Sequence, residues 1–439
     1  MALLPPDHPE RFVLAEEVHA RPFEPLETPS RASHIALLMD DDERARERAH
    51  MAALCERFGV APPASSVTHL SAKFGPVRVK WERHGEFSSY TFFAPGAGNG
   101  SFDDAAAALL PAGWLAGLPG VTVVAAHAQL LRLEGDPPAP ADLSADVFGG
   151  NTAVGAEIGG GAGLAFTDFR IHDDGFARFL VLDRGFAPRQ AGRMLQRLFE
   201  IETYRMLALL ALPIARRQSP RIVAIERALA ALTDDIARDG GDDESLLQEL
   251  TRLAAEVESG LAASQFRFGA SRAYYELVRN RIEDLREQRV DGLQTIEEFM
   301  TRRFAPAMAT CATTSQRLHD LSERVAQASG LLSTRVDIVR ERQNQALLSS
   351  MDRRAKLQLR LQQTVEGLSV AAIAYYVASL VGYLAKAIKA GGVHIDPDIV
   401  VGVTIPVVAA LVLFAVRRTR RRIERAERLP SKARVAEPA

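Results

Sequence analysis

The sequence contains little cysteine and lacks the motifs of several common enzyme classes. Among its 439 residues only Cys55 and Cys311 are cysteines, and their spacing suggests neither a zinc site nor a disulfide framework. Such sparse use fits a reducing cytoplasm. The sequence has no G-x-S-x-G nucleophile elbow and no H-E-x-x-H zinc motif. We therefore expect a protein that is not an enzyme, with no cofactor and no metal.

A strong excess of basic charge is also missing. The formal net charge is −2 and the isoelectric point is about 6.6, whereas a general nucleic-acid binder needs a strongly basic domain. We therefore expect no nucleic-acid partner. The first residues contain neither a basic start nor a long apolar run, so no signal peptide is predicted. Membrane insertion would then depend on segments near the C-terminus.

Two such segments, residues 367–385 and 399–416, contain no charged side chain. A helix of this length spans roughly 30 Å, which is the thickness of the hydrocarbon core of a bilayer. We predict two transmembrane helices. A buried helical hairpin of a soluble protein is the alternative, but arginine clusters at both ends are unusual for such a hairpin.

Basic residues flank the pair of segments on both sides, and the turn between them holds only Lys386 and Lys389. The positive-inside rule therefore predicts a multi-pass protein of the bacterial inner membrane with both termini in the cytoplasm. The basic tail, residues 417–439, is suited to anionic lipid. The flanking residues are Arg353, Arg354, Lys356 and Arg360 before the first segment, and Arg417, Arg418, Arg420, Arg421 and Arg422 after the second.

Residues 1–185 are predicted to form an α+β domain of the cytoplasm. Period-two alternation over 77–84 places Val77, Val79 and Trp81 on one face of a strand, and a β-rich run at 87–93 pairs with it. The dipeptide Asp174-Gly175 between β-rich arms predicts a hairpin. The other predicted elements are strands at 34–38 and 121–127, the latter buried on both faces, a helix at 41–58 ended by Gly59, and a short helix near 103–110.

Residues 186–366 are predicted to be a helical, coiled-coil region and stalk. One helix begins at Pro188, and a second begins at Ser219-Pro220 and ends at Gly240-Gly241. The following helix should pack on the second as an antiparallel coiled-coil hairpin. Its apolar face is predicted to contain Leu247, Leu250, Ala254, Val257 and Leu261.

A further helical segment is predicted at about 274–300. The helix after it, residues 307–366, contains no proline and leads into the first apolar segment. Val325, Val336 and Leu347 recur every eleven residues in it, and this spacing predicts a nearly straight or slightly right-handed stalk.

Three weaker signals have competing explanations. The glycine-rich run at 155–163 could hold a phosphate, but it lacks the lysine of a P-loop, so a loop or a glycine-rich strand is favoured. An acid–base or metal site could be assembled from the polar residues of the α+β domain, although structural roles are favoured. The residues considered for it are His84, Glu86, His127, Asp168 and His172, and His19, His34, Glu16 and Glu17 also fall in this domain.

The third signal lies in the first apolar segment. Tyr375, Ser379, Gly382 and Lys386 follow at i, i+4, i+7 and i+11, and so share one face of a helix. Such a stripe could line a pore, but small and hydroxyl side chains equally allow close helix packing in lipid, which we favour.

Five motifs together resemble a bacterial family known as domain of unknown function 3422. They are EVHARPF at 17–23, WERH at 81–84 with FSSYTFF at 87–93, TDFRIH at 167–172, EIETYR at 200–205, and MDRRAKLQLRLQQTVEGLSV at 351–370. The resemblance covers nearly the whole chain. It implies a membrane-anchored protein and carries no assigned activity.

The predicted order of elements also resembles the CorA-type magnesium channels, which join a cytoplasmic α/β domain to two C-terminal spans through a long helix. The Gly-Met-Asn signature of that family is missing, because Gly382-Tyr383-Leu384 stands at the corresponding place. Lys386 and Lys389 at the mouth would repel divalent cations.

Our first hypothesis is therefore a membrane-anchored, non-catalytic, oligomeric scaffold or partner-binding protein, whose partners are the lipid bilayer, further copies of itself and a cytoplasmic protein. A CorA-like oligomeric ion channel is the alternative, and a membrane-tethered enzyme is a third possibility.

Overall fold

The chain forms two compact units in the computed structural model, Met1–Leu332 and Ser333–Ala439. The structure describes residues 5, 7–17, 22–64, 67–99, 102, 104–238, 242–392 and 396–427. The predicted features at His19, Asp103 and Gly240-Gly241 lie outside these residues, as do the side chains of Glu16 and Glu17.

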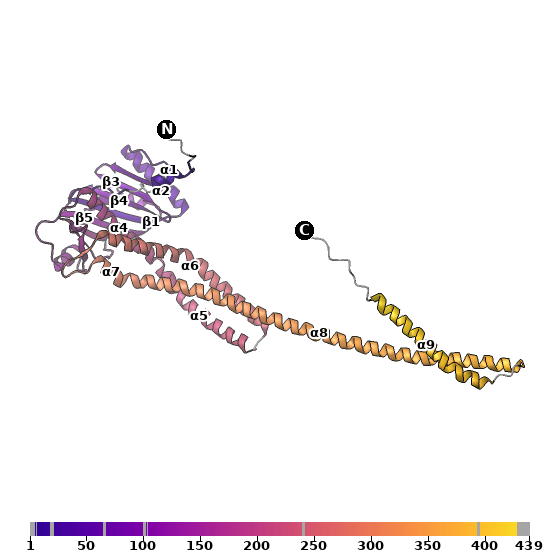
Figure 1. The fold of residues 1–439 in the computed structure, drawn as a ribbon. Helices are drawn as coiled ribbons and strands as arrows, with labels where there is room; N and C mark the ends of the chain where they lie inside the picture. The colour runs from indigo at the N-terminus through magenta and orange to yellow at the C-terminus, as the bar shows by residue number, and fades with distance from the viewer. Residues whose placement is uncertain are drawn as a thin grey trace. The chain divides into compact units, whose positions relative to one another are not determined.

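Among the described residues, nine strands form one mixed sheet at the centre of the first unit (Figure 1), in the order β2-β3-β4-β1-β5-β8-β7-β6-β9. Paired strands run antiparallel, except that β5 and β8 are parallel. The strands are β1 (Ser30–Leu38), β2 (His69–Phe74), β3 (Val77–Arg83), β4 (Phe87–Pro95), β5 (Val121–Arg132), β6 (Val154–Ile158), β7 (Gly163–Thr167), β8 (Ala177–Asp183) and β9 (Gln288–Arg289).

One face of the sheet is covered by α2 (Asp41–Phe58). This helix has the predicted bounds: Asp40 and Glu43 form a capping box at its start, and Gly59, at φ 67°, ends it. Val77, Val79 and Trp81 are buried on this face, as their alternation predicts. The buried carboxylate of Glu47 accepts hydrogen bonds from Trp81 Nε1 (2.8 Å) and Tyr90 Oη (2.7 Å).

The opposite face is covered by α4 (Pro188–Leu209), which begins at the predicted proline. Leu207 of α4 packs with Ala36 of β1, Phe87 of β4 and Val124 of β5. The long helix α6 (Asp243–Leu285) lies beside α4 (Figure 1). The sheet is therefore enclosed between helices on both sides, and polar side chains on either face must find partners inside the protein.

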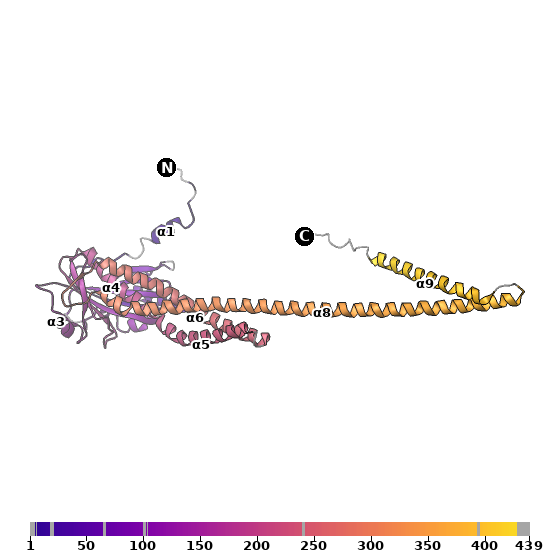
Figure 2. The ribbon, with the colours of Figure 1, turned by 60° about the horizontal axis from the view of Figure 1, so that its bottom comes forward.

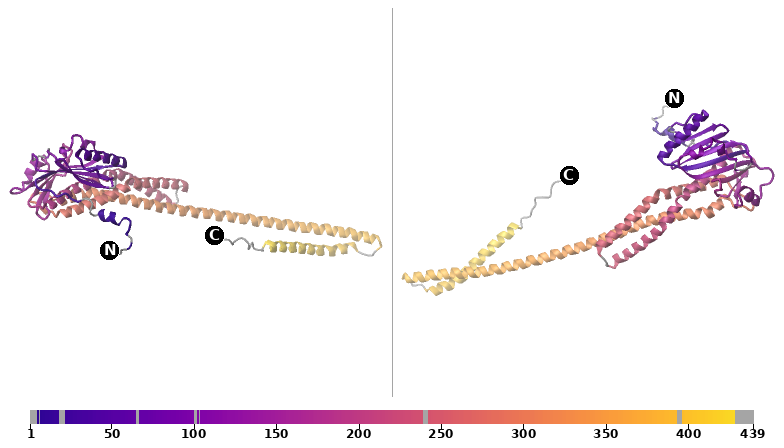
Figure 3. Two further views of the ribbon diagram at one scale, coloured as in Figure 1. Left: turned by 90° about the horizontal axis from the view of Figure 1, so that it is seen from above. Right: turned by 180° about the vertical axis from the view of Figure 1, so that it is seen from behind.

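Three helices form a bundle at one end of this unit (Figures 2 and 3). They are α5 (Leu212–Ala237), α6 and the first turns of α8 (Ala305–Ala390). They meet closely at Gly260 of α6, where a Cβ would lie 3.4 Å from Leu318 of α8 and 3.5 Å from Gln218 of α5. The two helices predicted to pair, α5 and α6, thus pack together with a third helix, α8. Their coiled-coil geometry stays a prediction.

Several predictions for the helical region are wrong in detail. The second helix begins at Leu212, with Pro220 inside it, because Ala215, Gln218 and Ile222 are buried across that proline and their packing outweighs its cost of about 3 kcal/mol. No separate helix fills 274–300: α6 continues to Leu285 and ends at Arg286, which has φ 52°. Strand β9 and the short helix α7 (Ile296–Arg303) follow.

The buried face of α6 is rotated from the predicted one. Leu250 and Val257 are buried as expected, but Leu247 is exposed and Leu246 is buried instead. One residue turns a helix by about 100°, and α6 must contact both α5 and α8. Helix α6 therefore buries a wider face than it would in a two-helix hairpin.

The sheet also differs from prediction at three places. β5 is longer than expected, and Val121 at its start is exposed, so only its later part is buried on both faces. A 3₁₀ turn, Ala106–Leu109, stands where a short helix is predicted, and a second 3₁₀ turn, Leu115–Gly117, follows it. The hairpin around Asp174-Gly175 is confirmed as β7 and β8, joined by a loop longer than predicted. The short helices α1 (Arg11–Glu17) and α3 (Pro140–Asp142), with the π-helical turn Leu143–Val147, complete the first unit.

The second unit contains the rest of α8 and helix α9 (Pro397–Glu427). The predicted continuous helix from residue 307 into the first apolar segment is confirmed by α8. Both helices are long and apolar enough to cross a membrane over the stretches that end at Ala390 and Ala415. Gly382 of α8 lies against α9, since a Cβ there would be 2.9 Å from Val401 Cγ2.

A close approach between α4 and the chain before β1 gives a test of this packing. A Cβ at Gly192 would lie 1.7 Å from the carbonyl oxygen of Glu24. Gly192→Ala must displace this backbone, and we expect a loss of about 1–3 kcal/mol in unfolding free energy. Tryptophan fluorescence during urea unfolding measures it, because Trp81 and Trp114 are the only tryptophans and both lie in the first unit.

Gly269 of α6 provides the matched control. It is also helical, but a Cβ there has no atom within 4 Å. Gly269→Ala should therefore stabilise the first unit by about 0.5–1 kcal/mol through helix propensity. Equal effects of the two substitutions would contradict the close contact at Gly192.

Candidate functional site

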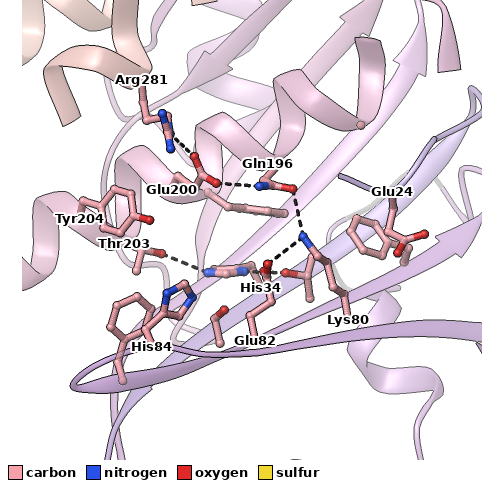
Figure 4. Close-up of a pocket in the computed structure, with 16 residues that line it drawn as sticks. Glu24, His34, Lys80, Glu82, His84, Gln196, Glu200, Thr203, Tyr204 and Arg281 are labelled. Atoms are coloured by element: carbon pink, nitrogen blue, oxygen red, sulfur yellow. Dashed lines mark hydrogen bonds and ion pairs between the residues drawn. The ribbon is translucent and has the colours of Figure 1, made fainter. Parts of the chain in front are cut away.

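A polar cavity of about 280 Å³ lies between the sheet and α4 (Figure 4). Its walls come from β1, β3, β4 and α4, with Arg281 of α6 and Glu24 at its edges. Polar residues mix with aromatic rings on these walls. Several ionisable side chains from separate segments of the chain face this one space, so we treat it as the candidate site.

Strand β3 supplies the charges. Its alternation turns Trp81 toward α2, so Lys80 and Glu82 point to the opposite face, under α4. Antiparallel pairing with β4 sets Thr91 opposite Lys80 and Ser89 opposite Glu82. Two neighbouring cross-strand pairs thus form a charged floor.

Helix α4 supplies a polar stripe above that floor. Gln196, Glu200 and Thr203 follow at i, i+4 and i+7 and so lie on one side of the helix. The rest of the covered surface of α4 is mostly apolar, including Leu195, Leu198 and other buried residues. The stripe therefore faces the sheet, not solvent.

A continuous chain of polar contacts joins floor and roof (Figure 4). Lys80 Nζ lies 3.0 Å from Glu82 Oε1 and donates to Gln196 Oε1 at 3.1 Å. Gln196 Nε2 donates to Glu200 Oε1 at 2.7 Å, and Arg281 Nε donates to the other oxygen of Glu200. Lys80 is only 5% exposed. Burying the Lys80–Glu82 ion pair is costly, so the bridging hydrogen bonds are needed to offset the lost hydration.

His34 of β1 lies at the centre of the cavity and connects the sheet to α4. Its Nδ1 lies 2.8 Å from Thr91 Oγ1 and its Nε2 lies 3.1 Å from Thr203 Oγ1, while its ring stacks on Phe199. Burial lowers the pKa of His34 to about 3, and the nearby His84 and Lys80 lower it further in the same direction. At neutral pH the ring is uncharged with both nitrogens engaged, which makes it a structural group.

The polar residues considered for an acid–base site do not come together. His84 lines the cavity and stacks on Phe87, whereas Glu86 pairs with Arg267 at 3.2 Å. Nδ1 of His127, on β5, lies 3.0 Å from the Oγ of Ser33, on β1. Asp168 and His172 contact each other at 3.0 Å in the loop between β7 and β8. Within the described ranges no group of three or more histidine, cysteine or acidic side chains could hold a metal ion.

The glycine-rich run at 155–163 forms β6, a tight turn and the start of β7, as the glycine-rich strand interpretation predicts. A Cβ at Gly155 would lie 2.6 Å from the carbonyl oxygen of Ala165, so the strand needs glycine to approach its neighbour.

The predicted stripe of the first apolar segment lies along a groove between α8 and α9 in the second unit. Tyr375, Ser379, Gly382 and Lys386 all line this groove together with α9 residues such as Val401. Gly382 is buried in the groove, while Tyr375 is 71% exposed. Ala374, Ala378 and Ala385 are buried beside them, so small side chains face α9.

The basic flanks lie on exposed helix surface where the structure describes them. Arg353, Arg354, Lys356 and Arg360 are exposed on α8, and Lys356 pairs with Asp352 at 2.6 Å. Arg417 and Arg418 are exposed on α9. Arg420, Arg421 and Arg422 continue that helix, but their side chains lie outside the described part, as do residues 428–439 of the tail.

The sequence analysis missed the network around Lys80. Alternating charges on a strand are typical of a solvent-facing side, and only the position of α4 turns that side inward. A usable signal was the polar stripe Gln196, Glu200 and Thr203 on an otherwise apolar helix. Two motifs of the family resemblance, 81–93 and 200–205, meet at this cavity.

The fold and the site define a class of protein: an α/β unit with an enclosed polar cavity, joined through one long helix to a pair of apolar helices. More specifically, residues 6–423 match the family described as protein of unknown function (DUF3422), and the chain belongs to this family. Comparison with curated proteins and with solved structures gives no match.

The burial of His34 predicts a pH dependence of stability. The unfolded chain binds a proton at His34 below its ordinary pKa of 6.5, while the folded protein does so only near pH 3. Stability is therefore lost as the pH falls below 6.5, and His34 should contribute about 2 kcal/mol to the loss between pH 7 and pH 5. Urea unfolding followed by tryptophan fluorescence at both pH values measures it.

His34→Gln should reduce this pH dependence by that amount, whatever its effect at pH 7. Part of the dependence should remain, because burial also lowers the pKa of His127, to about 4. His8→Gln, which changes an exposed histidine, should leave the dependence unaltered. An unchanged difference between pH 7 and pH 5 in the His34→Gln protein would show that His34 is not buried in the neutral form.

Proposed function

We propose that the protein is a membrane-anchored, non-catalytic scaffold that assembles with further copies of itself through α8 and presents its α/β unit to a cytoplasmic partner. The observation that carries this proposal is the exposure of large apolar side chains along α8 and α9. Two apolar helices support membrane association, and to this we add a proposed topology and mode of assembly.

The apolar helices expose bulky side chains over most of their surface. Tyr376 and Tyr383 of α8 are each 72% exposed, and Val403, Leu411 and Phe414 of α9 are more than half exposed. Each Å² of apolar surface left in water costs about 25 cal/mol, so helices of this kind are stable where the solvent is itself apolar. A bilayer meets that requirement over the uncharged length of both helices.

Basic residues support one orientation. Exposed arginines and lysines precede the apolar part of α8, and Arg417 and Arg418 follow that of α9. Cytoplasmic loops carry such residues preferentially. We therefore propose an inner-membrane hairpin with the α/β unit and both termini in the cytoplasm.

The stretch of α8 before the membrane supports self-assembly. Val325 and Leu332 are buried in the first unit. Farther along, Leu357 and Leu361 are 59% and 67% exposed, although they lie on one side of the helix at a spacing of four. A second copy of α8, held parallel by the same membrane, would cover this ridge as a coiled coil.

A non-catalytic role is supported by the state of the ionisable groups. Lys80 and Glu82 are paired with each other, Glu200 is paired with Arg281, and His34 is neutral with both nitrogens engaged. A general acid or base needs a pKa near the working pH and a proton path to a substrate. This network is suited to holding a shape.

The channel alternative requires a pore lined by Tyr375, Ser379 and Gly382. Gly382 instead lies against Val401, and the stripe borders the groove with α9. This arrangement favours helix packing, and the channel remains our second hypothesis.

Cysteine labelling in intact cells tests the orientation. Ala390→Cys at the outer turn should react with a membrane-impermeant maleimide, because we propose that this turn faces the outside. Ala355→Cys, also on an exposed part of α8, should react only after the membrane is permeabilised. The unmodified chain gives the background of the buried Cys55 and Cys311. Labelling of both positions from outside would exclude the proposed topology.

Light scattering of the full-length protein in mild detergent tests the assembly. We expect an oligomeric mass for the native chain, and a shift toward monomer for Leu361→Glu, since a buried unpaired carboxylate costs several kcal/mol. Gln363→Glu adds the same charge to the exposed, opposite side of the helix and should keep the native mass. A monomeric native chain would overturn the self-assembly proposal.

A further inference from the structure

We propose that the cavity between the sheet and α4 binds a free amino acid with an apolar side chain, through its ammonium and carboxylate groups together. This goes beyond the scaffold role, which does not depend on it. The proposal follows from the charges on the walls, from polar atoms that still lack a partner, and from the aromatic rings around them.

The walls carry charges of both signs at short range. Lys80 and Arg281 bring two positive charges, and Glu82, Glu200 and Glu24 bring three negative ones. A simple anion would meet three carboxylates, and a simple cation would be repelled by two positively charged side chains. A ligand with one charge of each sign fits such a site better than either, because each of its charges finds an opposite one.

The spacing of the central pair matches one kind of zwitterion. Lys80 Nζ and Glu82 Oε1 are only 3.0 Å apart. An α-amino acid carries its ammonium and its carboxylate on the same carbon, so its two charges are also adjacent. It can therefore place its carboxylate on Lys80 and its ammonium on Glu82 without separating the pair.

Hydrogen-bonding capacity remains on the floor of the cavity. An ammonium has three N–H donors, and Lys80 uses two of them, on Glu82 and Gln196. The third has no partner among the described residues, and neither has the hydroxyl of Ser89, which is 3% exposed and lies across from Glu82. A ligand carboxylate would accept from both.

Aromatic rings form the remaining wall. Phe87, Phe93, Phe199 and Tyr204 line the cavity beside the charged network. Such rings can cover an apolar side chain, and their faces also attract an ammonium group. A cavity of about 280 Å³ has room for one small molecule of this kind.

Glu24, at the edge of the cavity, belongs to the chain segment before β1. The backbone of Glu24 lies directly on Gly192 of α4, and its carboxylate is close to Arg78 Nε, at 3.6 Å, on β3. The chain before β1 thus bridges helix and sheet at the rim. A ligand inside the cavity would be shielded from solvent on this side.

Binding is tested on the full-length protein in detergent. Each of the twenty proteinogenic L-amino acids is added at about 10 mM, where even a millimolar site is about nine-tenths occupied. We expect at least one apolar amino acid to raise the thermal unfolding midpoint of the first unit, followed by tryptophan fluorescence, and to give a binding isotherm by calorimetry. No shift and no heat with any of them would overturn the proposal.

Analogues of the ligand test the recognition of both charges independently of any substitution. For L-leucine, 4-methylpentanoate lacks the amine and 3-methylbutylamine lacks the carboxylate; the same pair of analogues exists for other apolar amino acids. Each analogue should bind at least about tenfold more weakly, since one charged contact is lost. Equal binding of the acid alone would indicate an anion site, and equal binding of the amine alone a cation site; either result contradicts the proposal.

Variants then locate the site. Lys80→Gln and Glu82→Gln should each weaken binding at least about tenfold, whereas Lys73→Gln, on an exposed position of the neighbouring strand β2, should leave the affinity unchanged. Oligomeric mass, measured on the same samples, should be unaffected. Full affinity in folded Lys80→Gln protein would place any binding elsewhere.

Discussion

The first unit depends on one constraint: its sheet is covered on both faces, so charged side chains on either face must be satisfied inside the protein. On the α2 side a single carboxylate, Glu47, accepts from Trp81 and Tyr90. On the α4 side a chain of ion pairs and amide bridges runs from Glu82 to Arg281. An unpaired buried charge would cost several kcal/mol. Strand, helix and bundle are therefore held in one relative position.

This constraint explains why a cavity persists at the α4 face. Apolar side chains can slide and repack to fill a gap, but ion pairs and hydrogen bonds require particular distances and angles. His34, stacked on Phe199 and held by two threonines, fixes the centre of the face. The charged network around it keeps α4 at a distance from the sheet, and the space between them stays polar.

Sequence patterns predict the local elements of this chain better than their surroundings. The helix 41–58 was predictable to the residue because a capping box and a left-handed glycine lie at its ends. The inward direction of Lys80 and Glu82 was not predictable, because period two gives two faces and does not tell which elements cover them. Pro220 was misleading for a similar reason: its local preference is weaker than the burial of the helix around it. The cavity itself arises from contacts between segments more than a hundred residues apart, such as Lys80 with Gln196.

Helix α8 belongs to both units, and its large apolar residues are mostly buried in the first unit and exposed in the second. Over Ala305–Leu332, α8 buries Leu318, Leu321 and Leu332 against its neighbours and behaves as a core helix. Beyond Ser333 its large apolar residues are exposed, and they are first interspersed with arginines and then free of charge. Such a gradient along one continuous helix is difficult to reconcile with water as the only surroundings. It is consistent with a helix that leaves a folded domain and continues into the apolar surroundings of a bilayer.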